Sequence, residues 1–177
     1  MKNEKQKKVK SWLVFFGIMM VVFLSIGMFS KHVAQFSPVV GASMEPTFHD
    51  EDFLMINKMD YKEPNDVKRG DIVVFINNEY KCFLIKRVVG IPGDTIEIKE
   101  GAVFVNNVKQ EEPYAMGETE PAELTGPIRV NDNEFFVLGD NREGSEDSRY
   151  KWVGCVKYED ILGKITKRLF PNAAKFE

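Results

Sequence analysis

The sequence predicts a mostly β fold of many short strands, preceded by one N-terminal transmembrane helix. Short apolar runs separated by turn signals recur after residue 37, and no segment between Ser37 and Glu177 has a long helical period. Apolar runs bounded by Gly, Pro, Asn and Asp are typical of strands. A longer, uncharged apolar stretch near the N-terminus is typical of a membrane span.

Residues 12–30, WLVFFGIMMVVFLSIGMFS, carry no charge, and as a helix they would span about 28 Å, close to the hydrocarbon thickness of a bilayer. The residues before them contain one acid, Glu4, and five lysines: Lys2, Lys5, Lys7, Lys8 and Lys10. This charge bias predicts a cytoplasmic basic tail (1–11), a single-pass anchor in the cell membrane (12–30) and an extracytoplasmic domain (31–177).

Two alternatives exist for the apolar stretch. A cleaved signal peptide normally has a shorter apolar region followed by a small-x-small cleavage site, and the sequence SKHVAQFS that follows here has no such pair. The other alternative is a buried helix of a soluble protein. We therefore expect a retained anchor.

The predicted extracytoplasmic domain is acidic. Without the five lysines and one glutamate of the N-terminal region, 24 Lys+Arg and 27 Asp+Glu become 19 and 26, a net charge of −7. Such a domain is a poor nucleic-acid binder. Its two cysteines, Cys82 and Cys155, lie in apolar strand-like stretches, so we predict buried free thiols rather than a disulfide framework.

Eight apolar runs are predicted as strands: 53–58, 71–76, 80–89, 95–99, 103–108, 134–138, 152–156 and 161–166. Turns are predicted at 77–78, 91–94, 99–101 and 139–141. Residues 109–127 are acidic, contain three prolines and lack periodicity. We predict that they form the exposed part of an insertion, about 95–130, which begins with a hairpin at 95–108.

Lys86 lies in the middle of an apolar strand, CFLIKRVVG. Alternation along the strand places it on one face with Cys82, Leu84 and Val88. Burial disfavours a charged ammonium, and a fall in the lysine pKa from about 10.4 to roughly 7–8 makes the amine usable as a general base. The alternative is a structural lysine whose stem is buried while its ammonium group reaches water.

A general base needs a group to activate, and Ser43 is the candidate hydroxyl. It follows the small residues Gly41 and Ala42 in PVVGASMEPTF, which leave room for a substrate backbone. A neutral amine can take the serine proton during attack on a carbonyl. The alternatives are an ordinary loop serine and a histidine-based site, since a Ser-His-Asp triad or a Cys-His pair would have to use His32 or His49.

The segment GDNREGSEDSR places acids and arginines around two serines: Asp140, Arg142, Asp147, Arg149, Ser145 and Ser148. A serine here can accept a hydrogen bond from the lysine and orient it, while the charged residues fix the loop. One alternative is a solvated, ion-paired turn. Another is a calcium loop, although Arg142 stands where a ligand is needed.

Together these stretches resemble bacterial type I signal peptidases of the Gram-positive type, the membrane-anchored Ser/Lys leader peptidases. The resemblance covers most of the chain. Its motifs follow the anchor in the family's order: GASMEPT (41–47), RGDIVVF (69–75), KRVVGIPGD (86–94) and GDNREGSEDSR (139–149). It implies a β-rich catalytic core of antiparallel strands, with a small β region inserted between the lysine and the last motif.

The resemblance also implies roles for single residues. Ser43 matches the nucleophile, Lys86 the general base, and Ser145 the serine that orients the lysine. The charged residues expected to support these groups are Asp147, Arg149, Asp140 and Arg87.

Gly41 marks a departure from one form of the family pattern. Some members carry a serine at this position, and its hydroxyl helps to hold the oxyanion, the negatively charged oxygen formed during attack. Members of the Gram-positive type often have glycine, so we interpret Gly41 as a mark of subtype. Without that hydroxyl, the Ser43 backbone N–H remains as a donor. The loss of one such donor can lower the rate by about 10²–10³-fold where the oxyanion depends on it.

By this resemblance the chain is a serine endopeptidase that removes signal peptides from secretory preproteins through an acyl-enzyme, with no cofactor and no metal. Cleavage would follow a small-x-small sequence at the outer membrane surface. Val39, Val40 and Ile85 are expected to line shallow apolar pockets. Met44 and Phe48 either rest on membrane lipid or pack in the core.

Three other functions fit parts of the sequence. Ser148 and Lys151 match the S-x-x-K motif of penicillin-binding enzymes, but the companion S-D-N and K-T-G motifs are absent. A self-cleaving repressor domain shares a Ser/Lys pair, yet an anchor stands here in place of a DNA-binding region. A membrane-tethered domain that binds exported proteins without cutting them has only Gly41 in its favour.

Overall fold

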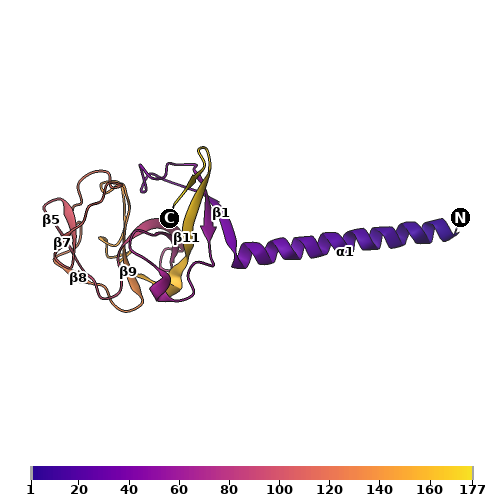
Figure 1. Cartoon of the computed structure of the whole chain (residues 1–177), viewed down its shortest axis with the longest axis horizontal. Helices are drawn as coiled ribbons and strands as arrows, with labels where there is room; N and C mark the ends of the chain where they lie inside the picture. Colours follow the sequence, from indigo (N-terminus) through magenta and orange to yellow (C-terminus); the bar gives the residue numbers. More distant parts are fainter. Residues whose placement is uncertain (1, 177) are drawn as a thin grey trace.

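The protein consists of one long helix and a β domain. The computed structural model describes the backbone of residues 2–176 and the side chains of residues 10–28 and 33–176. Helix α1 (Lys2–His32) extends away from the domain, with the N-terminus at its far end (Figure 1). The predicted basic tail, 1–11, lies almost entirely outside the described side chains.

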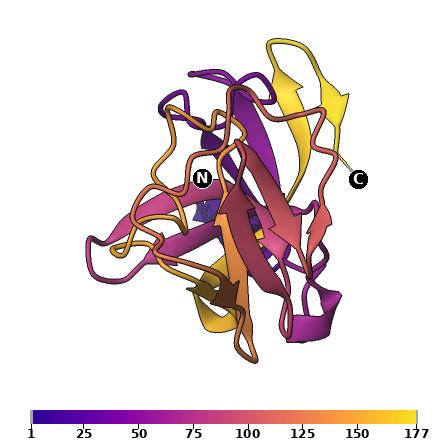
Figure 2. The same cartoon turned by 90° about the vertical axis from the view of Figure 1, so that its left-hand side faces the viewer.

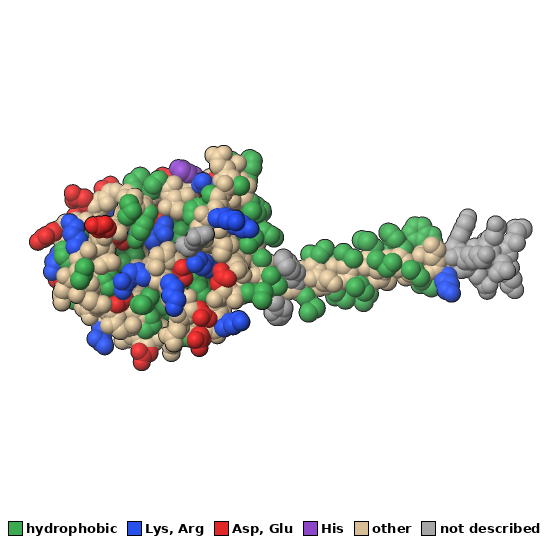
Figure 3. All heavy atoms as spheres, viewed as in Figure 1, with side chains coloured by type: hydrophobic (Ala, Val, Ile, Leu, Met, Phe, Trp, Pro, Cys, Tyr) green, Lys and Arg blue, Asp and Glu red, His purple; other side chains and the backbone are tan. Residues whose placement is uncertain are grey.

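Within α1, the segment Lys10–Met28 is long and apolar enough to cross a membrane. None of that segment is buried against the rest of the chain, so the alternative of a buried helix in a soluble protein is wrong. Apolar side chains cover the helix, whereas charged side chains of both signs are scattered over the visible face of the domain (Figure 3).

The larger sheet has eight strands and forms the body of the domain. Its order is β1–β2–β11–β3–β4–β9–β10, with β12 paired to β11, and every pairing is antiparallel. The bounds are β1 (Ala34–Pro38), β2 (Phe53–Asn57), β3 (Ile72–Asn77), β4 (Cys82–Gly90), β9 (Glu134–Leu138), β10 (Val156–Lys157), β11 (Ile161–Phe170) and β12 (Ala174–Lys175). The predicted fold class, mostly β with antiparallel strands behind one N-terminal helix, is confirmed.

The smaller sheet is formed by the chain between β4 and β9, in the order β7–β6–β5–β8. Its strands are β5 (Thr95–Lys99), β6 (Ala102–Val105), β7 (Val108–Lys109) and β8 (Ile128–Arg129). This sheet lies at the end of the domain far from α1 (Figure 1), the end that Figure 2 turns toward the viewer. Its apolar residues Ile96 and Val103 pack in one cluster with Val89 and Phe136 of the larger sheet.

Some segments differ from the predicted strands. The predicted strand 103–108 is a hairpin, because two asparagines between β6 and β7 take positive φ angles and reverse the chain. The predicted strand 152–156 is mostly a turn, since the Tyr150 carbonyl accepts the amide of Gly154 and only Val156 joins a strand. Strands β1, β8 and β12 and two short 3₁₀ helices, η1 (Pro64–Asp66) and η2 (Tyr158–Asp160), were not predicted.

Strand β4 changes its partner strand at Arg87. It pairs with β3 from Cys82 to Arg87, but with β9 only from Arg87 onward. Among the described strands, residues 82–86 therefore have a free edge. Backbone N–H and C=O groups at such an edge can pair with another extended chain.

The loop between β1 and β2 is packed onto the sheet by two buried side chains. Met44 and Phe48 are 1% and 0% exposed and belong to the core cluster that contains Leu54, Ile56 and Ile165. The expectation that these two residues rest on lipid is therefore wrong, and the alternative of core packing holds. Their burial fixes the backbone on both sides of the turn that follows Ser43.

Candidate active site

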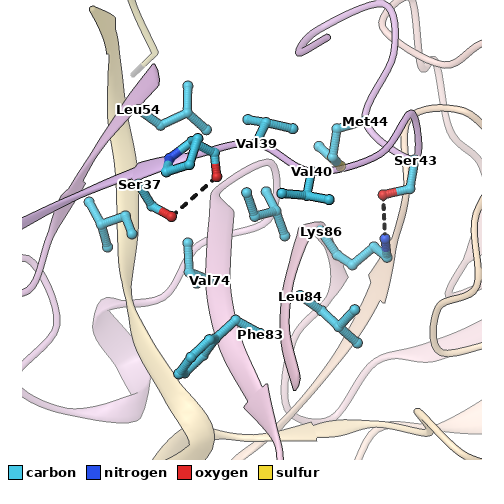
Figure 4. Close-up of a pocket in the computed structure, with 13 residues that line it drawn as sticks. Ser37, Val39, Val40, Ser43, Met44, Leu54, Val74, Phe83, Leu84 and Lys86 are labelled. Carbon is cyan, nitrogen blue, oxygen red and sulfur yellow. Dashed lines mark hydrogen bonds between the residues drawn. The ribbon is translucent and has the colours of Figure 1, made fainter. Parts of the chain in front are cut away.

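Ser43 and Lys86 meet beside the free edge of β4 (Figure 4). Ser43 lies in the loop between β1 and β2, and Lys86 is the fifth residue of β4. The distance between Lys86 Nζ and Ser43 Oγ is 2.6 Å, within hydrogen-bond range. The two residues that the sequence singled out are thus in direct contact, although 43 positions separate them in the chain.

Lys86 is buried, with 2% of its surface exposed. Burial lowers the pKa of Lys86 from its usual 10.5 to about 8, while the charge of Asp147 acts to raise it and that of Arg149 to lower it. The alternative of a lysine whose ammonium group reaches water is therefore wrong. An amine with this pKa is partly neutral near pH 7, and its neutral form can accept a proton.

Asp147 organises the loop of residues 139–149, hereafter the 139–149 loop. Its carboxylate is fully buried. It accepts hydrogen bonds from the Gly139 amide at 3.0 Å, the Ser145 hydroxyl at 2.8 Å and the Arg149 guanidinium at 2.8 and 2.9 Å. A buried charge needs such partners to offset its lost hydration. The loop is therefore an internally paired structure, and the alternative of a solvated turn is wrong.

Ser145 is buried in this loop, but its contacts differ from the expected one. Its hydroxyl donates to Asp147, and the hydrogen bonds of the described residues do not include one between Ser145 and Lys86. Ser145 nevertheless lies close to Ser43, because both flank Gly139: a Cβ added there would overlap the Ser145 side chain and lie 2.5 Å from the Ser43 carbonyl oxygen.

A second buried ion pair joins the strand of Lys86 to both loops. Arg87 donates to the two carboxylate oxygens of Asp140, at 2.8 and 2.6 Å. Asp140 also accepts the hydroxyl of Thr47, which belongs to the Ser43 loop. A bidentate arginine–carboxylate pair fixes both direction and distance. This pair therefore holds the Ser43 loop, β4 and the 139–149 loop in one arrangement.

A cleft of about 280 Å³ opens beside Ser43 and Lys86. Its lining is mostly apolar and includes the three predicted residues: Val39, which is buried, Val40, which is 89% exposed at the rim, and Ile85. The sequence did not indicate the other lining residues, which include Leu54, Val74, Phe83 and Leu84 (Figure 4). They come from β2, β3 and β4, so only the paired sheet brings them together.

Gly41, predicted at the oxyanion position, adopts a φ of 94°, which favours glycine. Its amide donates to Asp50 Oδ1 at 2.8 Å and so already has an acceptor. Within residues 33–176, by contrast, the Ser43 amide has no hydrogen-bond acceptor. The donor left available next to the serine is the one expected from the sequence.

Comparison with known proteins identifies the family. Residues 9–170 match the model of the family described as "Signal peptidase, peptidase S26". The chain belongs to this signal peptidase family. The resemblance inferred from the motifs, including its Gram-positive type, is confirmed, and the chain is a peptidase of the type I class.

Relatives of this signal peptidase family member extend over nearly its whole length. A "Signal peptidase I" from Bacillus caldolyticus is 36% identical over 97% of this chain and 96% of its own length. "Signal peptidase IB" from Staphylococcus aureus (strain COL) is 31% identical over 94% of this chain and 92% of its own. The crystal structure of a signal peptidase I from Enterococcus faecalis V583 is 30% identical, with a TM-score of 0.48 over 56% of this chain and 97% of that one.

In this member of the signal peptidase family, sequence reasoning missed three residues that connect the site. Asn141 donates to the backbone of the Ser43 loop, Thr47 donates to Asp140, and Gly139 lies between the Ser145 side chain and the Ser43 carbonyl. Gly139 and Asn141 lie inside a motif that was interpreted as a turn, and Thr47 inside the motif around Ser43. Their positions were therefore visible in the sequence, but their contacts were not.

The acidic segment predicted as the exposed part of an insertion is bound to the site. Residues 110–123, here called the strap, run beside the 139–149 loop. The Met116 amide donates to the Asp140 carbonyl at 2.7 Å, and the Arg142 amide donates to the Met116 carbonyl at 2.9 Å. Tyr114 lies under the guanidinium of Arg87, 3.9 Å from the ring centre.

Glu112 attaches the strap through a paired charge. Its carboxylate accepts hydrogen bonds from both Nη atoms of Arg142, at 2.7 and 2.8 Å. Arg142 also donates to the Gly139 carbonyl at 3.0 Å. The side chains of Arg142 and Glu112 are only 1% and 9% exposed. Removing Glu112 would leave a buried guanidinium without its counter-charge, which is strongly destabilising.

We therefore expect Glu112→Ala to lower the free energy of unfolding by about 3 kcal/mol, the range for breaking a buried ion pair. Glu111→Ala is the matched control, because Glu111 is the exposed neighbour and should change stability by less than about 0.5 kcal/mol. Urea unfolding of both variants in detergent measures the difference. Equal stabilities would contradict the role assigned to the Arg142–Glu112 pair.

The histidine and cysteine alternatives gain no support from the described residues. His49 is exposed, and the side chain of His32 lies outside the described residues. Cys82 and Cys155 are free thiols, as predicted, but each is half-buried rather than fully buried. Burial raises the pKa of Cys155 to about 11, so this thiol stays protonated at neutral pH.

Proposed function

We propose that this chain is a membrane-anchored serine endopeptidase that removes signal peptides from secretory preproteins by means of a Ser43–Lys86 dyad. The observation that carries this proposal is the buried amine of Lys86, 2.6 Å from Ser43 Oγ at the edge of an apolar cleft. The names of the relatives point to the same activity.

The proposed chemistry follows from the lowered pKa of Lys86. The neutral amine accepts the Ser43 hydroxyl proton while Ser43 Oγ attacks the carbonyl carbon of the scissile peptide. The resulting oxyanion is held by the Ser43 amide. The protonated Lys86 then gives its proton to the leaving amine, and an acyl-enzyme remains. Water, deprotonated by the same amine, releases the signal peptide and restores Ser43.

The cleft supports a substrate bound as an extended strand. The free edge at residues 82–86 offers backbone groups for pairing, and alternate substrate side chains would then face the cleft. The shallow lining formed by Val39, Val40 and Ile85 favours small side chains at the −1 and −3 positions.

The anchor supports a direction for the substrate. The cleft extends from Ser43 to Ser37 and Pro38 at the end of β1, the strand that follows α1 almost directly. A signal peptide held in the membrane would approach from this side. The bias of lysines before the apolar stretch 12–30 predicts that the tail stays in the cytoplasm and that the domain, with its cleft, lies outside.

Cleavage of a purified preprotein with an Ala-x-Ala site tests this function. The full chain in detergent should release a mature protein whose new N-terminus, found by mass spectrometry, follows the second alanine. Leucine at the −1 position and the Ser43→Ala variant should each prevent cleavage. A parent protein that binds the preprotein without cutting it would favour the tethered binding domain, and cleavage by Ser43→Ala would exclude Ser43 as the nucleophile.

The pH dependence provides a second test. Only neutral Lys86 can accept the serine proton, and its neutral fraction rises as the pH increases through its pKa of about 8. We expect kcat/KM to rise about tenfold per pH unit below this value and to level off above it, since kcat/KM reports groups of the free enzyme. Measurement between pH 6 and pH 10 checks the profile. A rate that is flat or falling through pH 8 would contradict a lysine base.

A further inference from the structure

We propose that Asn141 is a positioning residue that aims the Ser43 backbone N–H at the oxyanion. This inference rests on the proposed function, because it assigns a device to the same serine. Asn141 lies in the 139–149 loop, outside the set of residues that the sequence analysis placed in the site. Its side chain donates to neither the Lys86 amine nor the Ser43 hydroxyl.

Asn141 donates hydrogen bonds to two backbone carbonyls at the nucleophile, that of Ala42 and that of Ser43 itself. Its side-chain Nδ2 donates to the Ala42 carbonyl at 3.1 Å, and its backbone N–H donates to the Ser43 carbonyl at 3.1 Å. The Ala42 carbonyl and the Ser43 N–H belong to one planar, trans peptide unit, so they point in opposite directions. A bond that fixes the carbonyl therefore fixes the direction of the N–H.

Next to this peptide, the Gly41 amide donates to Asp50 and Ser43 Oγ accepts from Lys86, but neither bond holds the Ala42 carbonyl. Gly41 and Ala42 are both exposed, and Gly41 has the conformational freedom of glycine. The Ala42 carbonyl also accepts the Glu45 amide at 3.1 Å, but that bond lies within the same turn and cannot orient the turn relative to the domain. The Thr47–Asp140 bond links the loop to the domain farther along the chain, and the side chain of Asn141 provides the link at the Ala42–Ser43 peptide itself.

The orientation of the Asn141 amide group is itself defined. Its Oδ1 accepts the Gly144 amide at 3.0 Å, which leaves Nδ2 to face the Ala42 carbonyl. Aspartate has the same shape, so Asn141→Asp keeps the acceptor for Gly144 and replaces the donor to Ala42 by an oxygen. Asn141→Ala removes the side-chain bonds to Ala42 and Gly144, keeps the backbone bond to the Ser43 carbonyl and adds no charge.

Both variants are to be compared with the parent as full chains in detergent, using the Ala-x-Ala preprotein. We expect kcat to fall about 10- to 100-fold with KM within about twofold, because a misdirected donor weakens binding of the transition state only. The second probe is a peptide aldehyde ending in alaninal. Ser43 Oγ adds to its carbonyl carbon and the serine proton passes to the carbonyl oxygen, which gives a hemiacetal that resembles the tetrahedral intermediate. Its inhibition constant should rise by the same factor as kcat falls.

The pH profile separates this role from a charge effect on Lys86. Asn141→Ala should keep the parent's midpoint near pH 8, so its loss in rate should be equal at every pH. Asn107→Asp is the matched control, because Asn107 is exposed in the β6–β7 turn and the substitution adds the same charge far from the cleft. It should leave kcat unchanged.

The proposal is overturned if Asn141→Ala keeps the parent's kcat, if either variant raises KM alone, or if the loss in Asn141→Asp is only a shift of the pH profile. Aldehyde binding that stays constant while kcat falls would overturn it as well. A parent protein that cuts no preprotein would instead refute the proposed function, and this inference with it. Urea unfolding of each variant establishes that the compared proteins are folded.

Discussion

Replacing Lys86 with methionine is expected to abolish cleavage and, at the same time, to stabilise the folded domain. Methionine keeps much of the volume of the buried stem and removes the amine that contacts Ser43. Loss of the base should lower kcat/KM by at least about 10³-fold, within the range for general-base catalysis. Preprotein cleavage by parent and variant measures this loss.

The stability gain follows from the pKa of Lys86. In the folded chain this pKa is about 8, below its ordinary value of 10.5. Below pH 8 the folded chain must therefore hold a buried ammonium, and the cost disappears as the pH rises through 10.5. The shift corresponds to about 3 kcal/mol at neutral pH, since one pKa unit is about 1.4 kcal/mol.

Urea unfolding of Lys86→Met and the parent at pH 7 and pH 10 measures this gain. The variant should be more stable at pH 7, and the difference between the two proteins should narrow at pH 10. Ser43→Ala serves as the comparison, because it should lose activity without this dependence on pH. A Lys86→Met protein that is inactive but less stable than the parent at pH 7 would show that the lysine contributes to the fold, against the present account.

Replacing Gly139 with alanine is expected to cause the second large loss. An added Cβ would overlap the Ser145 side chain and lie 2.5 Å from the Ser43 carbonyl oxygen, so one of the two loops has to move. Both are held by buried hydrogen bonds and packed side chains, and neither can move freely. A displacement of about 1 Å at a catalytic group can cost about 10²-fold in rate, which is the loss that we expect.

Gly126→Ala is the matched control, because a Cβ there would meet no atom within 4 Å and the residue has no positive φ. Gly139→Ala should also lower the free energy of unfolding by about 1–3 kcal/mol, the usual cost of overpacking. Preprotein cleavage and urea unfolding of both variants test the two effects. Full activity in Gly139→Ala would mean that the loops are looser than their contacts indicate.

The sequence predicted those parts of the site that local patterns encode. Alternation along β4 placed Lys86 on a buried face, and the small residues before Ser43 indicated an accessible hydroxyl. The apolar runs gave most strands of the larger sheet. Each of these properties depends on neighbours within a few positions, which is why a single sequence could reveal it.

The rest depends on contacts between distant segments. The acidic composition of the strap indicated exposure, and most of its residues are exposed, but the Glu112 side chain is only 9% exposed because it pairs with Arg142, 30 positions later. Ser145 was expected to accept a hydrogen bond from Lys86, but Lys86 Nζ donates to Ser43 Oγ and the Ser145 hydroxyl donates to Asp147. In both cases the packing of the folded chain selects the partner of a polar side chain, and a single sequence does not show that packing.

The junction between helix and domain has a consequence for the reach of the enzyme. Only Val33 separates the end of α1 from the start of β1. In the proposed membrane-anchored enzyme, this short junction would let the rigid domain set the height of Ser43 above the bilayer. An extended preprotein advances about 3.3 Å per residue. A scissile bond that lies a few residues nearer to the membrane, or farther from it, than Ser43 would then miss the serine. The protein would thus select cleavage sites by their distance from the membrane surface.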